Sequence, residues 1–358
     1  MKTKISKIMR VVTPVMLVLL LALNVFTLYK VYALENGYDE NTEDVAQEND
    51  VSIGDYVIKS TTQISDAYKS GDSSKLSDKD KETLDMAKSV LDGIITDGMT
   101  DYEKELAVYR WMTSNIGFDE NSLSVIPESE TGEVDNPYGV LKYRSAVCVG
   151  YATTFRLFMQ MMNIDCMVVH DSYLSHSWDL VKLDGKWYHT DIYADTPGGN
   201  FSHFNVSDRT MMNINEWNTD FFPAADGYEY NYAYMNKTKC SDIYTIPGLL
   251  RAAIDSNKGV LSFDFGEKVD DDTYNVIETI MSKIEETAPF TADKSVTLSW
   301  EWLEADSENV FCIYINYEDN GGDADPEDGL DAATRQRIDS AVTKAFGEGV
   351  SSGSEAVG

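Results

Sequence analysis

The chain has 358 residues, with 61 acidic against 29 basic side chains and a formal net charge of −32. This charge excludes a general nucleic-acid binder or a ligand of anionic membranes, because both need clustered Lys and Arg. Four cysteines are too few for a disulfide framework, and 43% hydrophobic content is too high for a chain that is disordered throughout. At roughly 150 residues per domain, the length predicts about two domains with an acidic surface.

Residues 1–33 differ in composition from the rest. A start with four Lys or Arg precedes an uncharged apolar run from Val11 to Leu28, and Val31-Tyr32-Ala33 then suits a signal peptidase. At about 1.5 Å per residue the run spans roughly 27 Å, enough for a bilayer. We therefore predict a signal peptide or an uncleaved anchor. Either one exports the remainder, which is expected to be secreted or tethered to the membrane by residues 11–28.

The exported part is predicted to have four segments. Residues 35–50 contain seven acids and no base, a composition that cannot order itself. The predicted segments are an acidic linker at 34–60, a catalytic domain at 61–240, a smaller α+β domain at 241–346 and a disordered tail at 347–358.

In the segment 61–240, helical periodicity predicts a first helix through Leu84 and Ile94. A capping box of Thr100 and Glu103 then begins a second helix, which continues to about Ile116. A polar loop is expected at about 119–140. The elements expected after it are a helix from Cys148 to Met162, ended by Asn163, and strands at Cys166–Val169, His176–Leu183 and Lys186–Asp191.

The segment 242–346 predicts the order helix, strand, helix, strand, strand, helix. Alternating apolar residues mark the two later strands, and Ile338, Val342 and Phe346 mark the last helix. The acidic stretch 323–334 imitates the start of an EF-hand loop. It has Asp328 at the sixth position and Thr334 at the twelfth, so an acidic surface loop is the better interpretation.

The histidines indicate where chemistry is to be sought. All four fall between His170 and His203, directly after the predicted helix that begins at Cys148. A helix N-terminus carries roughly half a positive charge and so favours a thiolate there. A nucleophilic cysteine also needs a base and a group that orients the base. Cys148 is therefore the candidate nucleophile.

Hairpin geometry supplies the other two groups. Asp184-Gly185 is a type I′ turn signal, which makes Leu183 and Lys186 the first cross-strand pair. In this register His176 is diagonal to Asp191 on the same face, about 7–8 Å away at the backbone. The two side chains can span this backbone distance, so an imidazole–carboxylate hydrogen bond can form between them. Asp179 has the opposite parity and is expected to point to the other face.

These residues resemble a known family. The stretches Ala146–Tyr151, His176–Asp179 and Gly185–Asp191 look like the three motifs of the transglutaminase-like core, and Phe201–Asp208 resembles the stretch after the aspartate motif in bacterial members. The resemblance covers about residues 100–215. It implies a papain-like α+β fold and a catalytic triad of Cys148, His176 and Asp191. Asp179 stands where asparagine is commoner, and Ile192-Tyr193 replaces a Thr-Trp type sequence.

The implied reaction is acyl transfer through a thioester of Cys148, with protein or peptide carboxamides at the cell surface as substrates. The acceptor, water or an amine, stays open. No cofactor, metal ion or nucleic-acid partner is expected, and contact with the membrane is expected only through an uncleaved N-terminal segment. The alternative is a catalytically inactive module of the same fold that binds or assembles at the cell surface.

The remaining histidines and cysteines have structural interpretations. His189 is expected to be a structural hydrogen-bonding group beside the His–Asp pair, and His170 and His203 to be surface or loop groups. Cys166 is expected to be an inert buried thiol. A disulfide between Cys240 and Cys312 is possible, but no feature of the sequence favours it.

Overall fold

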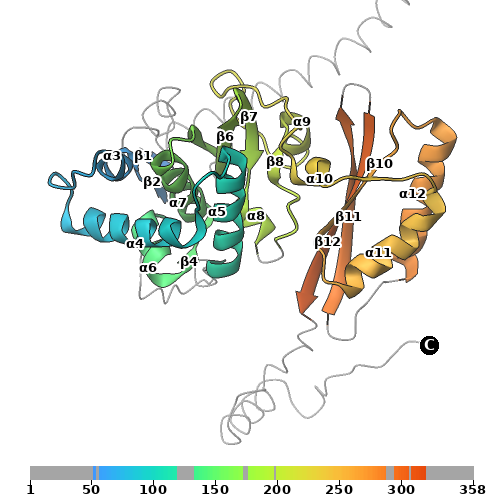
Figure 1. Ribbon diagram of the computed structural model, residues 1–358, viewed down its shortest axis with the longest axis horizontal. Helices are drawn as coiled ribbons and strands as arrows, with labels where there is room; N and C mark the ends of the chain where they lie inside the picture. The colour runs from blue at the N-terminus through green and yellow to red at the C-terminus, as the bar shows by residue number, and fades with distance from the viewer. Residues whose placement is uncertain are drawn as a thin grey trace, which may run out of the picture.

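Figure 1 shows the computed structural model of the chain. The residues it describes are 51–53, 56–118, 133–171, 176–196, 199–287, 294–305 and 308–319. The predicted N-terminal signal or anchor, most of the acidic linker, the acidic loop at 323–334, the last predicted helix and the tail lie outside them. In the described ranges, no helix is both long and apolar enough to cross a bilayer.

Five helices precede the first large sheet in the described part of the chain. They are α3 (Thr62–Ser70), α4 (Asp78–Ile94), α5 (Asp101–Asn115), α6 (Pro137–Tyr143) and α7 (Cys148–Met161). The predicted capping box begins α5: the Glu103 carboxylate accepts from the Thr100 backbone N–H at 2.8 Å, and the Thr100 hydroxyl accepts from that of Glu103 at 3.2 Å. Asn163, predicted to end α7, has φ 58°, the left-handed conformation that is common directly after a helix.

Helix α6 corrects the predicted loop at 119–140, which ends at residue 136 or earlier. The Asn136 side chain caps the helix by accepting from the Gly139 N–H, and Pro137 occupies the first turn. An Asn-Pro step before an apolar run is a helix start signal. The abundance of turn residues concealed it.

Helix α7 is the centre of the first hydrophobic core. Thirteen of its 14 residues are buried, including Arg156, so burial extends well beyond a single apolar stripe. The Arg156 guanidinium donates to the Thr61 hydroxyl and to the Lys59 carbonyl at 3.2 and 2.6 Å. This buried cation thereby fixes the segment before α3 to the middle of α7.

An antiparallel sheet with strand order β5-β6-β7-β8 follows α7. Its strands are β5 (Cys166–His170), β6 (Ser177–Leu183), β7 (Lys186–Thr190) and β8 (Phe204–Val206). The predicted hairpin register is confirmed, since Leu183 pairs with Lys186 and Asp179 with Thr190. Asp184 and Gly185 have φ 47° and 84°, as a type I′ turn requires. Strand β8 is too short for its alternation to be recognised.

The two faces of this sheet bury different clusters. Cys166, Val181 and Leu183 face the helical core that includes α7. Trp178 and Leu180 lie on the opposite face, packed with a cluster that contains Trp217 and Phe222. This alternation places a residue of β6 or β7 on one side or the other by parity alone.

A second four-stranded sheet has the order β11-β12-β10-β9. It contains β9 (Thr238–Lys239), β10 (Val260–Asp264), β11 (Lys294–Ala305) and β12 (Glu308–Asp319), with the helices α11 (Ile246–Asp255) and α12 (Asp271–Thr287). The elements from α11 to β12 follow the predicted order. Both helices cover the face away from the first sheet, whereas α10 (Tyr232–Met235) meets the near face (Figure 1). The fold is mixed α+β, as predicted.

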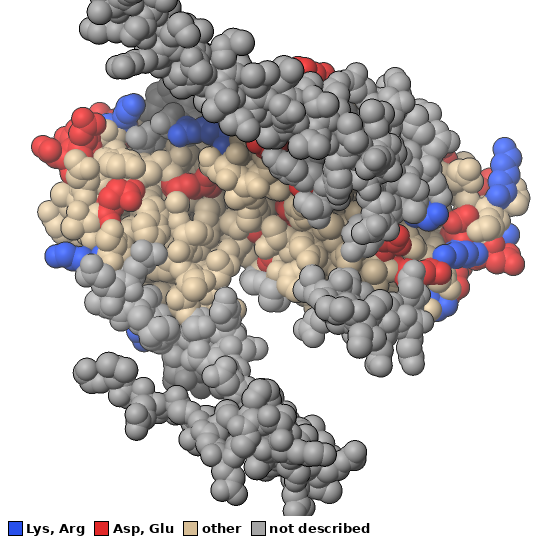
Figure 2. All heavy atoms as spheres, turned by 180° about the vertical axis from the view of Figure 1, so that it is seen from behind, with Lys and Arg blue, Asp and Glu red and all other residues tan. Residues whose placement is uncertain are grey.

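On the face seen in Figure 2, the Lys and Arg side chains of the described residues do not gather in one area. Blue and red side chains alternate at both ends of the described surface, and no continuous basic patch appears among the described residues there. Where described residues are visible in the middle of this face, most of them are uncharged.

Candidate active site

Cys148 is the first residue of α7. The preceding strand β4 (Ser145–Ala146) pairs in parallel with β3 (Gly117–Phe118), and the Val147 N–H donates to the Val134 carbonyl at 3.1 Å. A Cβ at position 150 would lie 2.1 Å from that carbonyl oxygen, so this close approach needs Gly150. The cysteine is thereby held at the helix start. Cys148 is 8% exposed, so a small part of the residue is accessible to solvent.

The side chains of His176 and Asp191 meet as the hairpin register predicts. His176 Nε2 and Asp191 Oδ2 are 2.5 Å apart. The other Asp191 oxygen accepts from the Ala194 N–H at 3.0 Å and so caps the short helix α8 (Ile192–Asp195). The Asp191 N–H donates to the His203 carbonyl at 2.9 Å. Asp191 is thus fixed through both carboxylate oxygens and its backbone.

The third side chain, the thiol of Cys148, lies close enough to the His176 imidazole to contribute to its raised pKa. Because Nε2 is occupied by Asp191, Nδ1 is the nitrogen left for the sulfur. The His176 backbone exchanges hydrogen bonds with Asp171, whose carboxylate accepts at 3.1 Å and whose N–H donates at 3.0 Å. The structure therefore brings all three predicted residues together, from a helix start, a strand start and a strand end.

The charges of the three groups reinforce one another. Burial disfavours a protonated His176, but the Asp191 carboxylate and Cys148 outweigh it and raise the pKa of His176 to about 10. Burial alone would raise the pKa of Asp191, but the charge and hydrogen bond of the adjacent His176 imidazolium together have the larger effect and lower that pKa. At neutral pH the pair is an imidazolium and a carboxylate. An imidazolium beside the Cys148 sulfur stabilises negative charge there.

Aromatic side chains border the cysteine. The Tyr193 ring centroid is 5.8 Å from that of His176 and 4.8 Å from that of Phe118. Tyr193 also packs on the cluster that contains Cys148, Val149 and Val168. Burial, and then the charges of Cys148 and Asp191, raise the pKa of Tyr193, so its hydroxyl remains a donor. This residue is one of the departures from the family pattern.

The structure corrects the prediction for His170, whereas His203 lies in a turn before β8, as expected of a loop group. His170 is buried at the end of β5, where its ring meets Phe222 edge to face, and burial lowers its pKa to about 4. His203 Nδ1 lies 2.9 Å from the buried carboxylate of Asp195, which raises the pKa of His203 against the effect of burial. Neither is a free surface group. His189 is a structural hydrogen-bonding group, as predicted, and contacts Asp208 and Trp178.

The other cysteines lie away from the triad. Cys166 Sγ is 3.5 Å from Asp179 Oδ1 on the face of the sheet opposite His176, which confirms the parity predicted for Asp179. Burial raises the pKa of both groups well above their ordinary values. Cys166 is therefore a protonated thiol. All four cysteines are free, so the possible bond between Cys240 and Cys312 is not formed.

A buried polar network beneath the sheet escaped prediction from the sequence. Asn205 Nδ2 donates to Glu105 Oε2 at 2.8 Å, and Thr190 Oγ1 lies 3.3 Å from both Glu105 Oε1 and Asn205 Oδ1. A protonated Glu105 can donate to Thr190 while Thr190 donates to Asn205, so all these contacts become hydrogen bonds at once. Burial raises the pKa of Glu105 to about 8. The hydrogen bonds of this network are all satisfied when Glu105 is protonated and uncharged.

Glu105→Gln is expected to stabilise the protein at alkaline pH. Because the pKa of Glu105 is raised from 4.5 to about 8, wild-type stability is lost as pH rises through this interval. Glutamine supplies the same donor at every pH and avoids this loss, on the order of 4 kcal/mol at its upper end. Urea unfolding at pH 5 and pH 9 tests this. The two proteins should be similar at pH 5 and differ at pH 9, and an equal difference at both would refute the assignment.

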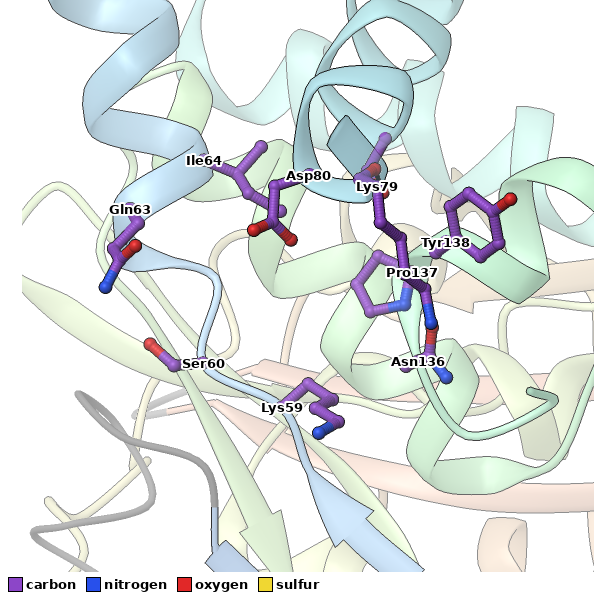
Figure 3. A pocket seen from close by; sticks show the side chains of 10 residues that line it. Lys59, Ser60, Gln63, Ile64, Lys79, Asp80, Asn136, Pro137 and Tyr138 are labelled. Atoms are coloured by element: carbon purple, nitrogen blue, oxygen red, sulfur yellow. Dashed lines mark hydrogen bonds between the residues drawn. The ribbon is translucent and has the colours of Figure 1, made fainter. Parts of the chain in front are cut away.

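No three His, Cys, Asp or Glu side chains are grouped to hold a metal ion in the described ranges. A cavity of about 400 Å³ lies between α3, α4 and α6. Its lining includes Lys59, Gln63, Lys79 and Asn136 (Figure 3) but none of the three triad residues. The Lys79 ammonium is paired with Glu133 at 2.8 Å. This cavity is separate from the chemistry at Cys148.

One comparison with known proteins matches the segment that contains these residues. Residues 88–192, which include all three side chains, match the model of the Transglutaminase-like superfamily. The chain therefore contains a transglutaminase-like superfamily domain over these residues.

The other comparisons add little. No curated protein matches the chain. A solved structure described as a TGase is 15% identical, with 42% of this chain and 40% of that chain covered and a TM-score of 0.27. This chain thus spans well under half the length of that structure. A TM-score this low does not establish a common fold.

Proposed function

We propose that the chain is an exported cysteine acyltransferase or peptidase that acts on protein or peptide carboxamides through a thioester of Cys148. The observation that supports this most is the 2.5 Å contact between His176 and Asp191, with Cys148 near enough to raise the pKa of His176. A cysteine with a purely structural role would need neither a histidine nor an aspartate beside it. Of the His176 side chain 22% is exposed, against 1% of Asp191, so the base and not its orienting group is accessible.

In the proposed reaction the Cys148 sulfur attacks the carbonyl carbon of a carboxamide and a C–S bond forms. The tetrahedral intermediate then breaks its C–N bond, and the His176 imidazolium gives its proton to the departing ammonia or amine. Water or a primary amine next attacks the thioester and loses a proton to His176. The C–S bond breaks and Cys148 is regenerated. Asp191 keeps the ring oriented and stabilises its positive charge throughout.

Backbone N–H groups at the start of α7 are the proposed donors to the negatively charged oxygen of the tetrahedral intermediate. Val147 offers no side-chain cap, so the first backbone N–H groups of the helix are not occupied by one. The Cys148 N–H is adjacent to the attacking sulfur and is the proposed first donor of an oxyanion hole.

Export rests on the basic start and apolar run of residues 1–33. One experiment tests location and chemistry together. Intact cells that produce the chain receive a biotinylated primary amine that cannot cross membranes, and cells with Cys148→Ala serve as the control. Label on surface proteins that depends on Cys148 supports an exported transferase. Cys148-dependent new termini or ammonia without label indicate hydrolysis.

The competing function is an inactive module that binds at the cell surface. It predicts that the two strains give identical label, termini and ammonia, both with intact cells and after lysis. Activity that appears only after lysis would retain the chemistry and refute export.

A further inference from the structure

We propose that His189 and Asp208 are positioning residues for His176, and that they act through the indole of Trp178. The proposal extends the proposed function, because it concerns how the base is held. His189 was expected only to be a structural group. The structure connects it to the base through one side chain.

The chain of contacts starts in the sheet. Trp178 Nε1 donates to His189 Nδ1 at 2.9 Å, and His189 Nε2 lies 2.8 Å from Asp208 Oδ1. The other oxygen of Asp208 accepts from the Ala225 N–H at 3.1 Å, and the Asp208 N–H donates to the Ala225 carbonyl at 2.7 Å. Asp208 is therefore immobilised at the first residue of α9 (Asp208–Met211).

These contacts determine which His189 nitrogen carries the proton. Nδ1 accepts from an indole, which can only donate, so in the neutral ring the proton is on Nε2 and is donated to Asp208. Burial lowers the pKa of His189 although Asp208 opposes this, so the ring stays neutral. Asp208 is the charged group that faces it, and the Trp217 ring covers it edge to face at 4.6 Å. Asp208 thus selects the tautomer that Trp178 requires.

Trp178 is the platform for the base. Its ring and that of His176 are stacked, with centroids 5.8 Å apart and planes at 23°. Trp178 is 1% exposed, so its N–H cannot turn to water if His189 no longer accepts it. Contacts with Cys148 and Asp191 hold the edge of the His176 ring, and the stack holds its plane. A rotated indole would tilt the imidazole away from both partners.

Two substitutions of His189 separate the two hydrogen bonds. The amide oxygen of asparagine reaches the place of Nδ1, so His189→Asn keeps an acceptor for Trp178. The amide nitrogen of glutamine reaches the place of Nε2, so His189→Gln keeps the bond to Asp208 and leaves the indole N–H unpaired. Both remove the imidazole. A general loss of packing would affect both alike.

The readout is the pH titration of the His176 ring by NMR, which requires no turnover. In His189→Gln the ring should bind its proton at least about tenfold more weakly than in the wild type, because it moves away from Asp191. In His189→Asn it should stay near the wild-type value, and the Trp178 indole N–H signal should move only in the glutamine variant. An unchanged titration in a folded His189→Gln, or equal changes in both variants, would overturn the proposal.

A measurement on the wild type protects the test against a variant that does not fold. ¹⁵N NMR of His189 should show Nε2 protonated and Nδ1 unprotonated at and above neutral pH. A proton on Nδ1 would overturn the proposal. The outcome is independent of the proposed function, which fails if Cys148 is unreactive even where His176 is held as described.

Discussion

Asp191→Asn is expected to reduce turnover by about 10²–10⁴-fold and to leave the fold intact. Asparagine caps helices as well as aspartate does, so its oxygen can still accept from the Ala194 N–H. Its amide then points an N–H group at His176 Nε2. That nitrogen must accept, which puts the remaining ring proton on Nδ1, the side of Cys148. The ring can no longer take a proton from the thiol, and its imidazolium form loses a negative neighbour.

Asp179→Asn is the matched control. Asp179 lies on the opposite face of the same strand, beside Cys166, and burial already favours its protonated form. The change to an amide is expected to cost less than about tenfold in turnover. Both variants are compared with the wild type on one substrate after their melting temperatures are measured. A dead Asp179→Asn beside a nearly normal Asp191→Asn would show that the triad is wrongly assigned.

Cys148→Ala is expected to remove all turnover above the background and to lower the pKa of His176. No other group near the base can form the thioester. Cys148 contributes to the raised pKa of His176, about 10 in the wild type. Without the sulfur this pKa should fall but stay above its ordinary value, because Asp191 remains. Turnover assays and NMR titration of His176 measure the two effects.

Cys166→Ala controls for the loss of a buried thiol. Cys166 belongs to the helical core and contacts Asp179, not the base. Its substitution is expected to cost roughly 1 kcal/mol of stability and to leave both turnover and the titration of His176 unchanged. If Cys148→Ala kept its activity, or if both variants lost activity equally, Cys148 could not be the nucleophile.

The parts of the site that the sequence predicted depend on local rules. The turn at Asp184-Gly185 sets the pairing, and strict alternation then carries His176 and Asp191 to one face. The start of α7 follows from the change of an irregular segment into a helical pattern. No long-range information was needed for either. These rules bring His176 and Asp191 together, and the resemblance to the transglutaminase-like core added Cys148 to the pair.

The unpredicted parts depend on residues far apart in the chain. Glu105 occupies the buried face of an ordinary amphipathic helix, and its partner Asn205 is 100 positions away. The Asp195 carboxylate accepts a hydrogen bond from the Tyr109 hydroxyl, 86 positions away, and also contacts His203. Spacing in one segment carries no sign of such pairs. One signal was available: an acid at a core position of a helix has to find donors, and this could have marked Glu105.

Alkylation by iodoacetamide at pH 6 tests the central claim most directly. The His176 imidazolium lies beside Cys148, whereas Cys166, Cys240 and Cys312 are buried thiols whose pKa burial raises. Mass spectrometry of the folded protein should show rapid modification of Cys148 alone, and this selectivity should disappear in His176→Ala. Four equally slow cysteines at pH 6 would contradict a catalytic thiolate and would favour the inactive binding module.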